Sequence, residues 1–115
     1  MAVSTTYSVA VQSTGDITYT QTFTSAANAS GSGDIDLQTL ASGANTITPP
    51  NSSSKGCLFI PPSGNVVVLT LKGVTGDTGI LIHLTNPTLI TVASGSTTFV
   101  INAASSVTGC RFIWF

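Results

Sequence analysis

The sequence predicts an all-β protein, an antiparallel and jelly-roll-like β-sandwich of eight to ten short strands. Runs of β-branched and aromatic residues recur about every ten residues, and clusters of Gly, Pro, Asn and Ser separate them. No segment of ten or more residues repeats its apolar positions with the 3.6-residue period of a helix. The length of 115 residues corresponds to a single domain.

The N-terminal region, residues 1–33, predicts a β-hairpin arm and a loop. Apolar and polar residues alternate from Val3 to Gln12 and again from Ile17 to Thr24, and the segment Ser13–Asp16 between them has the composition of a turn. The Ser/Gly-rich segment Ser25–Gly33 holds no residue that could anchor a core. We therefore expect an arm that a linker joins to a sandwich formed by residues 34–115.

Residues 34–115 supply the expected strands of the sandwich. The pairs Pro49–Pro50 and Pro61–Pro62 mark strand ends or edges, because proline cannot donate a hydrogen bond to a ladder. Residues 34–42 favour a strand, with one short helix as the alternative. The other strands are expected at residues 44–48, 57–60, 66–71, 80–84, 89–92, 97–103 and 110–115.

The last expected strand is apolar on both faces. Alternation places Phe112 and Trp114 on one face, and Ile113 and Phe115 on the other. Such a strand has to be covered twice, by its own sandwich and by a neighbouring element or subunit. Two interpretations remain open at this point, a central core strand with a buried terminus and a strand that forms an interface.

The chain is nearly uncharged. Its three basic and four acidic residues amount to 6% and give a net charge of −1, whereas a soluble domain usually has roughly a quarter of charged residues. Polar surface comes instead from 15 serines and 19 threonines. Three widely spaced cations cannot neutralise a row of phosphates, which makes nucleic acid a poor partner.

A membrane location is not expected either. The mean hydropathy is +0.43, yet no apolar run approaches the roughly 18–20 residues that span a membrane. The first residues lack the basic and apolar regions of a secretory signal. We therefore expect a protein that is made and assembled in the cytoplasm.

Cys57 and Cys110 predict neither a disulfide scaffold nor a metal site, because they are only two and far apart in the sequence. We expect both to be buried as apolar residues, and a bond between them is the less favoured alternative. No sequence motif for a metal or cofactor is present, so neither is expected.

Three features could carry chemistry, and each has a simpler interpretation. His83 has no nucleophile or carboxylate at a recognised spacing, which favours a structural histidine. The tripeptide Asp77-Thr78-Gly79 matches the aspartic-protease signature, but it follows a Gly-rich segment and fits a tight turn. Asp34 and Asp36 could hold Ca²⁺, and solvated charges at a loop end are the default interpretation. We expect no catalytic residue and no enzymatic activity.

Five stretches within residues 44–115 resemble known proteins. These stretches are Asn45–Pro50, Ile60–Val66, Leu69–Ile80, His83–Thr88 and Val107–Trp114, and residues 1–33 lie outside them. The stretches resemble the small virion-associated proteins of tailed bacteriophages. The resemblance implies a β-sandwich protein of the head or tail that is not an enzyme.

Together, the resemblance and the composition predict a capsid decoration, or cement, protein of the virion. A surface rich in hydroxyls suits docking onto a lattice, because removing Ser or Thr from water costs less than removing a charge. We expect a homotrimer that staples subunits of the major capsid protein. A tail or fibre accessory is the alternative, with loops Asn51–Lys55 and Gly73–Gly79 contacting host-surface glycan.

Partner-binding residues are expected in the arm and in the last strand. The arm would reach a neighbour by strand addition, in which an extended segment adds a strand to an exposed sheet edge. The expected residues are Tyr7, Val9, Tyr19 and Phe23 of the arm, and Ile113 and Phe115 of the last strand.

Overall fold

The structure, a computed structural model, describes residues 6–12, 18–24, 35–50, 52, 54–94 and 97–114. For the strands at 6–12 and 18–24, and for Ile35, the description is limited to the backbone. All regular elements in these ranges are β-strands, and every strand pair is antiparallel. The predicted all-β antiparallel sandwich is therefore confirmed.

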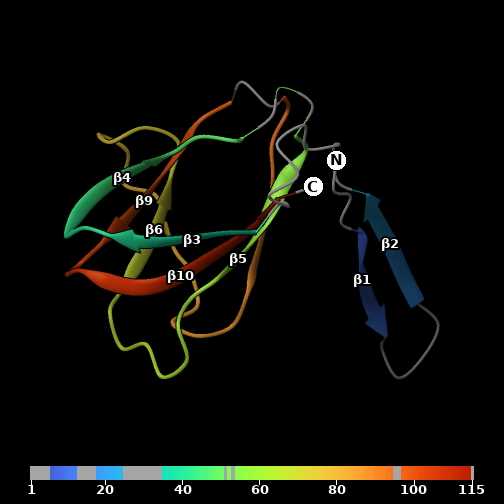
Figure 1. Cartoon of the computed structure of the whole chain (residues 1–115), viewed down its shortest axis with the longest axis horizontal. Helices are drawn as coiled ribbons and strands as arrows, with labels where there is room; N and C mark the ends of the chain where they lie inside the picture. Colours follow the sequence, from blue (N-terminus) through green and yellow to red (C-terminus); the bar gives the residue numbers. More distant parts are fainter. Residues whose placement is uncertain are drawn as a thin grey trace.

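Eight strands form two four-stranded sheets that pack against each other (Figure 1). The first sheet, sheet 1, has the order β3-β10-β5-β8, and the second, sheet 2, has the order β4-β9-β6-β7. The strands of sheet 1 are β3 (Ile35–Leu40), β10 (Val107–Trp114), β5 (Gly56–Ile60) and β8 (Thr88–Thr91). Those of sheet 2 are β4 (Gly43–Ile47), β9 (Phe99–Ala103), β6 (Leu69–Lys72) and β7 (Ile80–Leu81).

The strand pairs of the sandwich are nested along the chain. β6 pairs with β7, β5 with β8, β4 with β9 and β3 with β10, so each outer pair encloses the pair before it. The pairs β5–β10 and β6–β9 then complete the two sheets. As a result β7 and β8, which follow each other in the chain, are the edge strands on one side of the sandwich, and β3 and β4 are those on the other side.

The N-terminal strands form a two-stranded sheet of their own. β1 (Thr6–Gln12) pairs with β2 (Thr18–Thr24), as the sequence predicts, and neither belongs to a sheet of the sandwich. Because opposite residues of an antiparallel ladder belong to one face, the odd-numbered positions of both strands share a face. The pairs on that face are Tyr7 with Phe23, Val9 with Gln21, and Val11 with Tyr19.

Aromatic residues form the centre of the core between the sheets. The rings of Phe59 and Phe112 lie 4.9 Å apart between their centroids, and the Trp114 ring lies 6.2 Å from Phe112 and 6.3 Å from Phe99. All four side chains are buried, with aliphatic residues such as Ile101 around them. The alternation predicted for the last strand is confirmed at Phe112 and Trp114, and β10 is a central strand of sheet 1.

Some strand bounds differ from the prediction. Residues 35–40 form a strand, which decides against the helix alternative. The runs at 66–71 and 80–84 are strands only over Leu69–Lys72 and Ile80–Leu81. The last strand begins at Val107, three residues earlier than predicted. It includes a register shift between Val107 and Cys110, and Gly109 there has a positive φ of 88°, which a glycine adopts without strain.

Candidate interaction surface

Only one of the predicted partner-binding residues has a described side chain. Ile113 lies on the outer face of sheet 1, half-buried, where its ladder partner on β5 is Leu58. Leu58 in turn pairs with Leu89 on β8, so an apolar row crosses these three strands. The side chains of Tyr7, Val9, Tyr19 and Phe23, and all of Phe115, lie outside the described residues. Their predicted roles therefore remain predictions.

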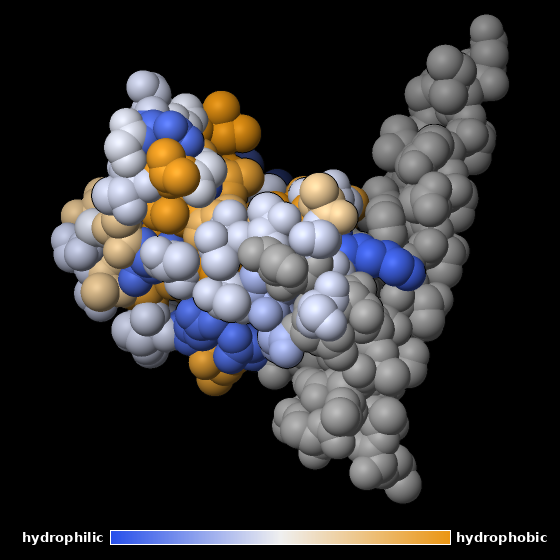
Figure 2. Space-filling view, turned by 90° about the horizontal axis from the view of Figure 1, so that it is seen from above, coloured by the Kyte–Doolittle hydropathy of each residue, from blue (hydrophilic) through white to orange (hydrophobic). Residues whose placement is uncertain are grey.

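A second apolar surface, which the sequence analysis missed, lies on the side of the sandwich formed by β7 and β8. Among the described residues, most of the exposed large apolar side chains belong to β6, β7 and the segments next to them. They are Val66, Val68, Val74, Ile80, Leu81 and Leu84, and Leu89 on β8 adds another. Figure 2 shows such apolar side chains exposed among polar ones on the upper side of the sandwich.

Hydrogen bonds of Asn65 keep part of this surface, at Val66, Val68 and Leu84, out of the strands. The side-chain amide of Asn65 donates to the carbonyl oxygens of Val67 (3.0 Å) and Leu84 (2.8 Å). These bonds hold the segment before β6 beside the segment after β7 in an irregular conformation. The sequence predicts strands over residues 66–71 and 80–84, and the structure leaves Val66–Val68 and Ile82–Leu84 outside the strands. One feature of the sequence could have indicated an edge strand: the run Ile80–Leu84 is short and lies between a Gly-rich loop and Asn86–Pro87.

Both edge strands on this side point backbone groups away from the sandwich. The N–H of Val92 donates to the carbonyl oxygen of Lys55 at 2.8 Å. This bond lies next to the Gly56–Thr91 pair, at the end of the β5–β8 ladder. Successive residues of an antiparallel strand direct their N–H and C=O groups to opposite sides. The backbone groups of Leu89 and Thr91 therefore point away from β5. The bond from Ile82 N–H to the Leu69 carbonyl (3.0 Å) likewise directs the backbone groups of Leu81 away from β6.

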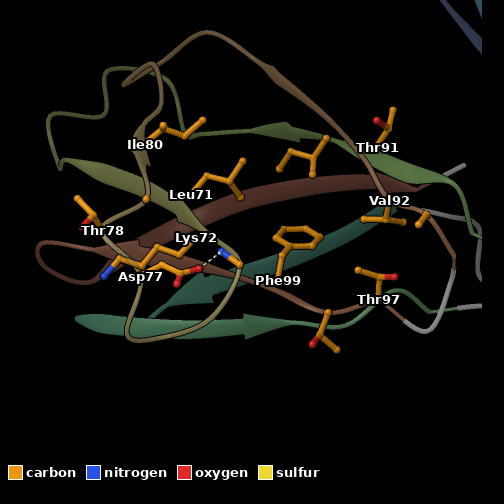
Figure 3. A pocket seen from close by; sticks show the side chains of 14 residues that line it. Leu71, Lys72, Asp77, Thr78, Ile80, Thr91, Val92, Thr97 and Phe99 are labelled. Carbon is orange, nitrogen blue, oxygen red and sulfur yellow. Dashed lines mark hydrogen bonds between the residues drawn. The ribbon is translucent and has the colours of Figure 1, made fainter.

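A cleft of about 690 Å³ lies between the two sheets on this side. Its floor consists of apolar side chains of the core edge, and Figure 3 shows Leu71, Phe99 and Val92 along it. Ile80 of β7 lines one wall, 65% exposed, and Thr91 of β8 lines the other. This volume is within the range of small-molecule sites, and it also suffices for the side chains of an added strand.

The loop between β6 and β7 closes one end of the cleft and uses the carboxylate of Asp77. Its Oδ2 accepts hydrogen bonds from the N–H groups of Gly73 (3.1 Å) and Val74 (3.0 Å). The N–H of Asp77 donates in turn to the carbonyl oxygen of Val74 at 3.1 Å. The tripeptide Asp77-Thr78-Gly79 thus belongs to a turn, in which Asp77 stabilises the loop (Figure 3).

His83 also stabilises a turn. Its Nδ1 accepts hydrogen bonds from the N–H groups of Thr85 (3.1 Å) and Asn86 (2.8 Å). An imidazole nitrogen that accepts two bonds is unprotonated at that position. The exposed His83 therefore orders the connection between β7 and β8, which agrees with the structural interpretation.

Cys57 and Cys110 are free and fully buried. Cys57 pairs in the ladder with Trp114, which lies four residues, or about 13 Å, beyond Cys110 on the same strand, so the Cα atoms of the two cysteines are more than about 13 Å apart. A disulfide needs less than about 7 Å, which rules out the alternative of a bond. Burial raises the pKa of the Cys57 thiol to about 12 and also raises the pKa of Cys110.

A second pocket, of about 680 Å³, lies at the other end of sheet 1. Its lining includes Arg111, Asn86 and the segment Ile60–Gly64. Arg111 is the only charged residue there, and the described part of the chain holds no group of three or more His, Cys, Asp or Glu residues that could bind a metal. Asp36 accepts a hydrogen bond from Gln38 at 2.6 Å, while Asp34 lies outside the described residues.

No helix in the described ranges is long and apolar enough to cross a membrane. No protein-family model, curated protein or solved structure matches the chain. The geometry of the β7–β8 side, with its cleft, exposed aliphatic residues and outward backbone groups, is thus the main indication of how the molecule acts.

Proposed function

We propose that this protein is a non-enzymatic structural protein of a tailed-bacteriophage virion, most specifically a capsid decoration protein that binds the lattice of the major capsid protein. The observation that carries the proposal is the β7–β8 side, where large aliphatic residues and strand-edge backbone groups are exposed together. Exposed apolar surface of this kind marks sites of protein association. A scaffold with so few charges loses little solvation energy when it is covered.

Two further features support the same function. The nested order of the strand pairs supports the proposed jelly-roll-like form of the sandwich, and jelly rolls occur among viral capsid proteins. The sequence from Ala44 to Phe115 also resembles small virion-associated phage proteins, as described above. The proposed protein assembles in the host cytoplasm as a homotrimer, and its N-terminal hairpin reaches a neighbour by strand addition.

Copy number in purified particles tests the location. A decoration protein is expected at hundreds of copies per particle, measured by quantitative mass spectrometry against the major capsid protein. Deletion of residues 1–33 should abolish binding to capsids, with the circular dichroism and cooperative melting of the sandwich retained. Undiminished binding of the deletion variant would refute the arm, and a copy number of a few would refute the decoration function.

The second candidate is a tail or fibre accessory that binds host-surface glycan. It is favoured by the cleft beside Gly73–Gly79, because hydroxyl groups of Thr78, Thr91 and Thr97 surround an apolar floor that contains Phe99. Hydroxyl and aromatic groups are suited to a sugar ring, which has polar edges and apolar faces. Saturable binding to host cells that Phe99→Ala abolishes while the sandwich still melts cooperatively, together with a low copy number per particle, would support this candidate.

A further inference from the structure

The β7–β8 side has the features of an incomplete sheet edge. Leu89 and Thr91 of β8 present N–H and C=O groups away from β5, in the spacing that an antiparallel strand would use. The cleft next to them is lined by Ile90, Leu71 and Phe99 of the core edge. A strand added to β8 would therefore form backbone hydrogen bonds and direct alternate side chains into the cleft.

We propose that the N-terminal hairpin, β1–β2, of a second copy of this chain adds to the free edge of β8 and covers the cleft. The contact is made between copies of the chain alone. It assigns the β7–β8 side to assembly of the proposed homotrimer and rests on that part of the proposed function, whereas the copy number in particles tests capsid binding separately.

The hairpin has the composition that this edge requires. Neither β1 nor β2 contains a charged residue, and β7 and β8 contain none either, so the strands that meet carry no charge. The two charged residues of the cleft lining, Lys72 and Asp77, have opposite signs. The ladder places Tyr7, Val9 and Val11 at positions of one face. Apolar residues at every second position match a cleft that receives alternate side chains.

The hairpin also needs a partner. A two-stranded hairpin by itself is marginally stable in water. Within one chain, β1 and β2 pair with none of the eight sandwich strands, which leaves the hairpin available to a sheet edge of another copy. The ten residues 25–34 that connect the hairpin to β3 can span up to about 33 Å, which suffices to reach a neighbour. Contacts of this head-to-tail kind form a ring, such as a trimer, when the rotation between copies closes, and an open filament when it does not.

The test uses the full chain, its molar mass from light scattering over a range of concentrations, and amide hydrogen exchange. We expect an oligomer in which the amides of Leu89 and Thr91 are protected. Thr91→Pro removes an N–H that points away from β5 and should raise the dissociation constant about tenfold or more. Thr91→Ala keeps that N–H and is the matched control, which should remain oligomeric.

A second pair of variants tests the cleft independently of proline effects. Ile80→Asp places a charge in the cleft wall and should dissociate the oligomer, whereas Leu37→Asp is the control, because Leu37 is equally exposed (67% against 65%) but lies on β3 at the opposite edge. Thermal melting verifies that each variant is folded. A monomeric wild-type chain would overturn the proposal, whether or not the two amides are protected. So would an oligomer in which they exchange freely or which Ile80→Asp leaves intact.

Discussion

Gly56 of β5 lies against Ile90 of β8 so closely that a Cβ atom at position 56 would overlap the carbonyl oxygen of Ile90. Gly56 also has a φ of 153°, which residues with a side chain rarely adopt. The pairing of β5 with the edge strand β8 therefore depends on a glycine at this position. This relationship matters for function because β8 forms one wall of the cleft.

Replacing Gly56 by alanine should destabilise the protein by about 1–3 kcal/mol, the range for overpacking at a tight site. The measurement is the free energy of unfolding from denaturant titration. Gly76→Ala is the control, because a Cβ there has no neighbour within 4 Å and the backbone does not require positive φ. Equal effects of the two substitutions would contradict the close approach of β5 and β8.

Trp114 offers a test of how the core is stabilised. Its side chain is 2% exposed, and its indole Nε1 has no hydrogen-bond partner. Trp114→Phe removes the unpaired N–H and keeps an aromatic ring, so it should cost much less stability than Trp114→Ala, for which about 3–5 kcal/mol is expected. A large loss in the Phe variant would indicate that Nε1 is bonded in solution, for example to a buried water.

The buried thiol of Cys57 predicts a loss of stability at alkaline pH. Its pKa is raised from 9.0 to about 12 in the folded protein, so above pH 9 the unfolded chain ionises this thiol while the folded chain keeps it protonated. The unfolded state then binds fewer protons, and the free energy of unfolding decreases as the pH rises from 9 towards 12.

Urea denaturation at pH 7 and pH 10 measures this effect. In Cys57→Ala the decrease between the two pH values should be smaller than in the wild type, whatever the stability at pH 7. A thiol reagent should also modify the native protein slowly, because thiolate is the reactive form and both cysteines are buried. Rapid labelling of the folded chain would contradict the burial.

Asn45 holds the β3–β4 connection against β9. Its Nδ2 donates to the carbonyl oxygens of Ala41 (2.9 Å), Gly43 (3.1 Å) and Ile101 (3.1 Å), and its Oδ1 accepts from the N–H of Ala41 (2.9 Å). Asn45→Ala should lower the free energy of unfolding by about 1–3 kcal/mol, because carbonyl groups lose their donor. Thr46→Ala, at an exposed position on the same strand, is the control and should cost less than about 1 kcal/mol.

The sequence predicted a sandwich strand well where alternating residues show which face of the strand is buried. The period-two alternation of Phe112 and Trp114 identified the buried face of β10, because a strand buried on one face repeats every second residue. The predicted hairpin is present, with Tyr7 opposite Phe23. Val66–Val68 and Ile82–Leu84 were mistaken for strands, because an apolar run has the same composition whether it is buried in a sheet or exposed at an edge.

The candidate site could not be predicted from the sequence. The cleft joins Leu71, Ile90 and Phe99, which belong to three strands and come together only because the strand pairs are nested. The free backbone groups of Leu89 and Thr91 depend on which strand ends the sheet, a property that no residue encodes on its own. Predicted partner residues such as Ile113 came instead from the two-sided apolar pattern of the last strand.

The sequence by itself determined the all-β class, the scarcity of charge and the absence of a recognisable catalytic motif, because these follow from composition and from patterns within a few residues. The tertiary structure decided which strands are edges, that Cys57 and Cys110 lie too far apart to bond, and that Asp77 and His83 stabilise turns. The physical reason is that hydrogen-bond partners and strand neighbours in a sandwich are distant in sequence. They are therefore fixed by the global pairing of strands and not by local preference.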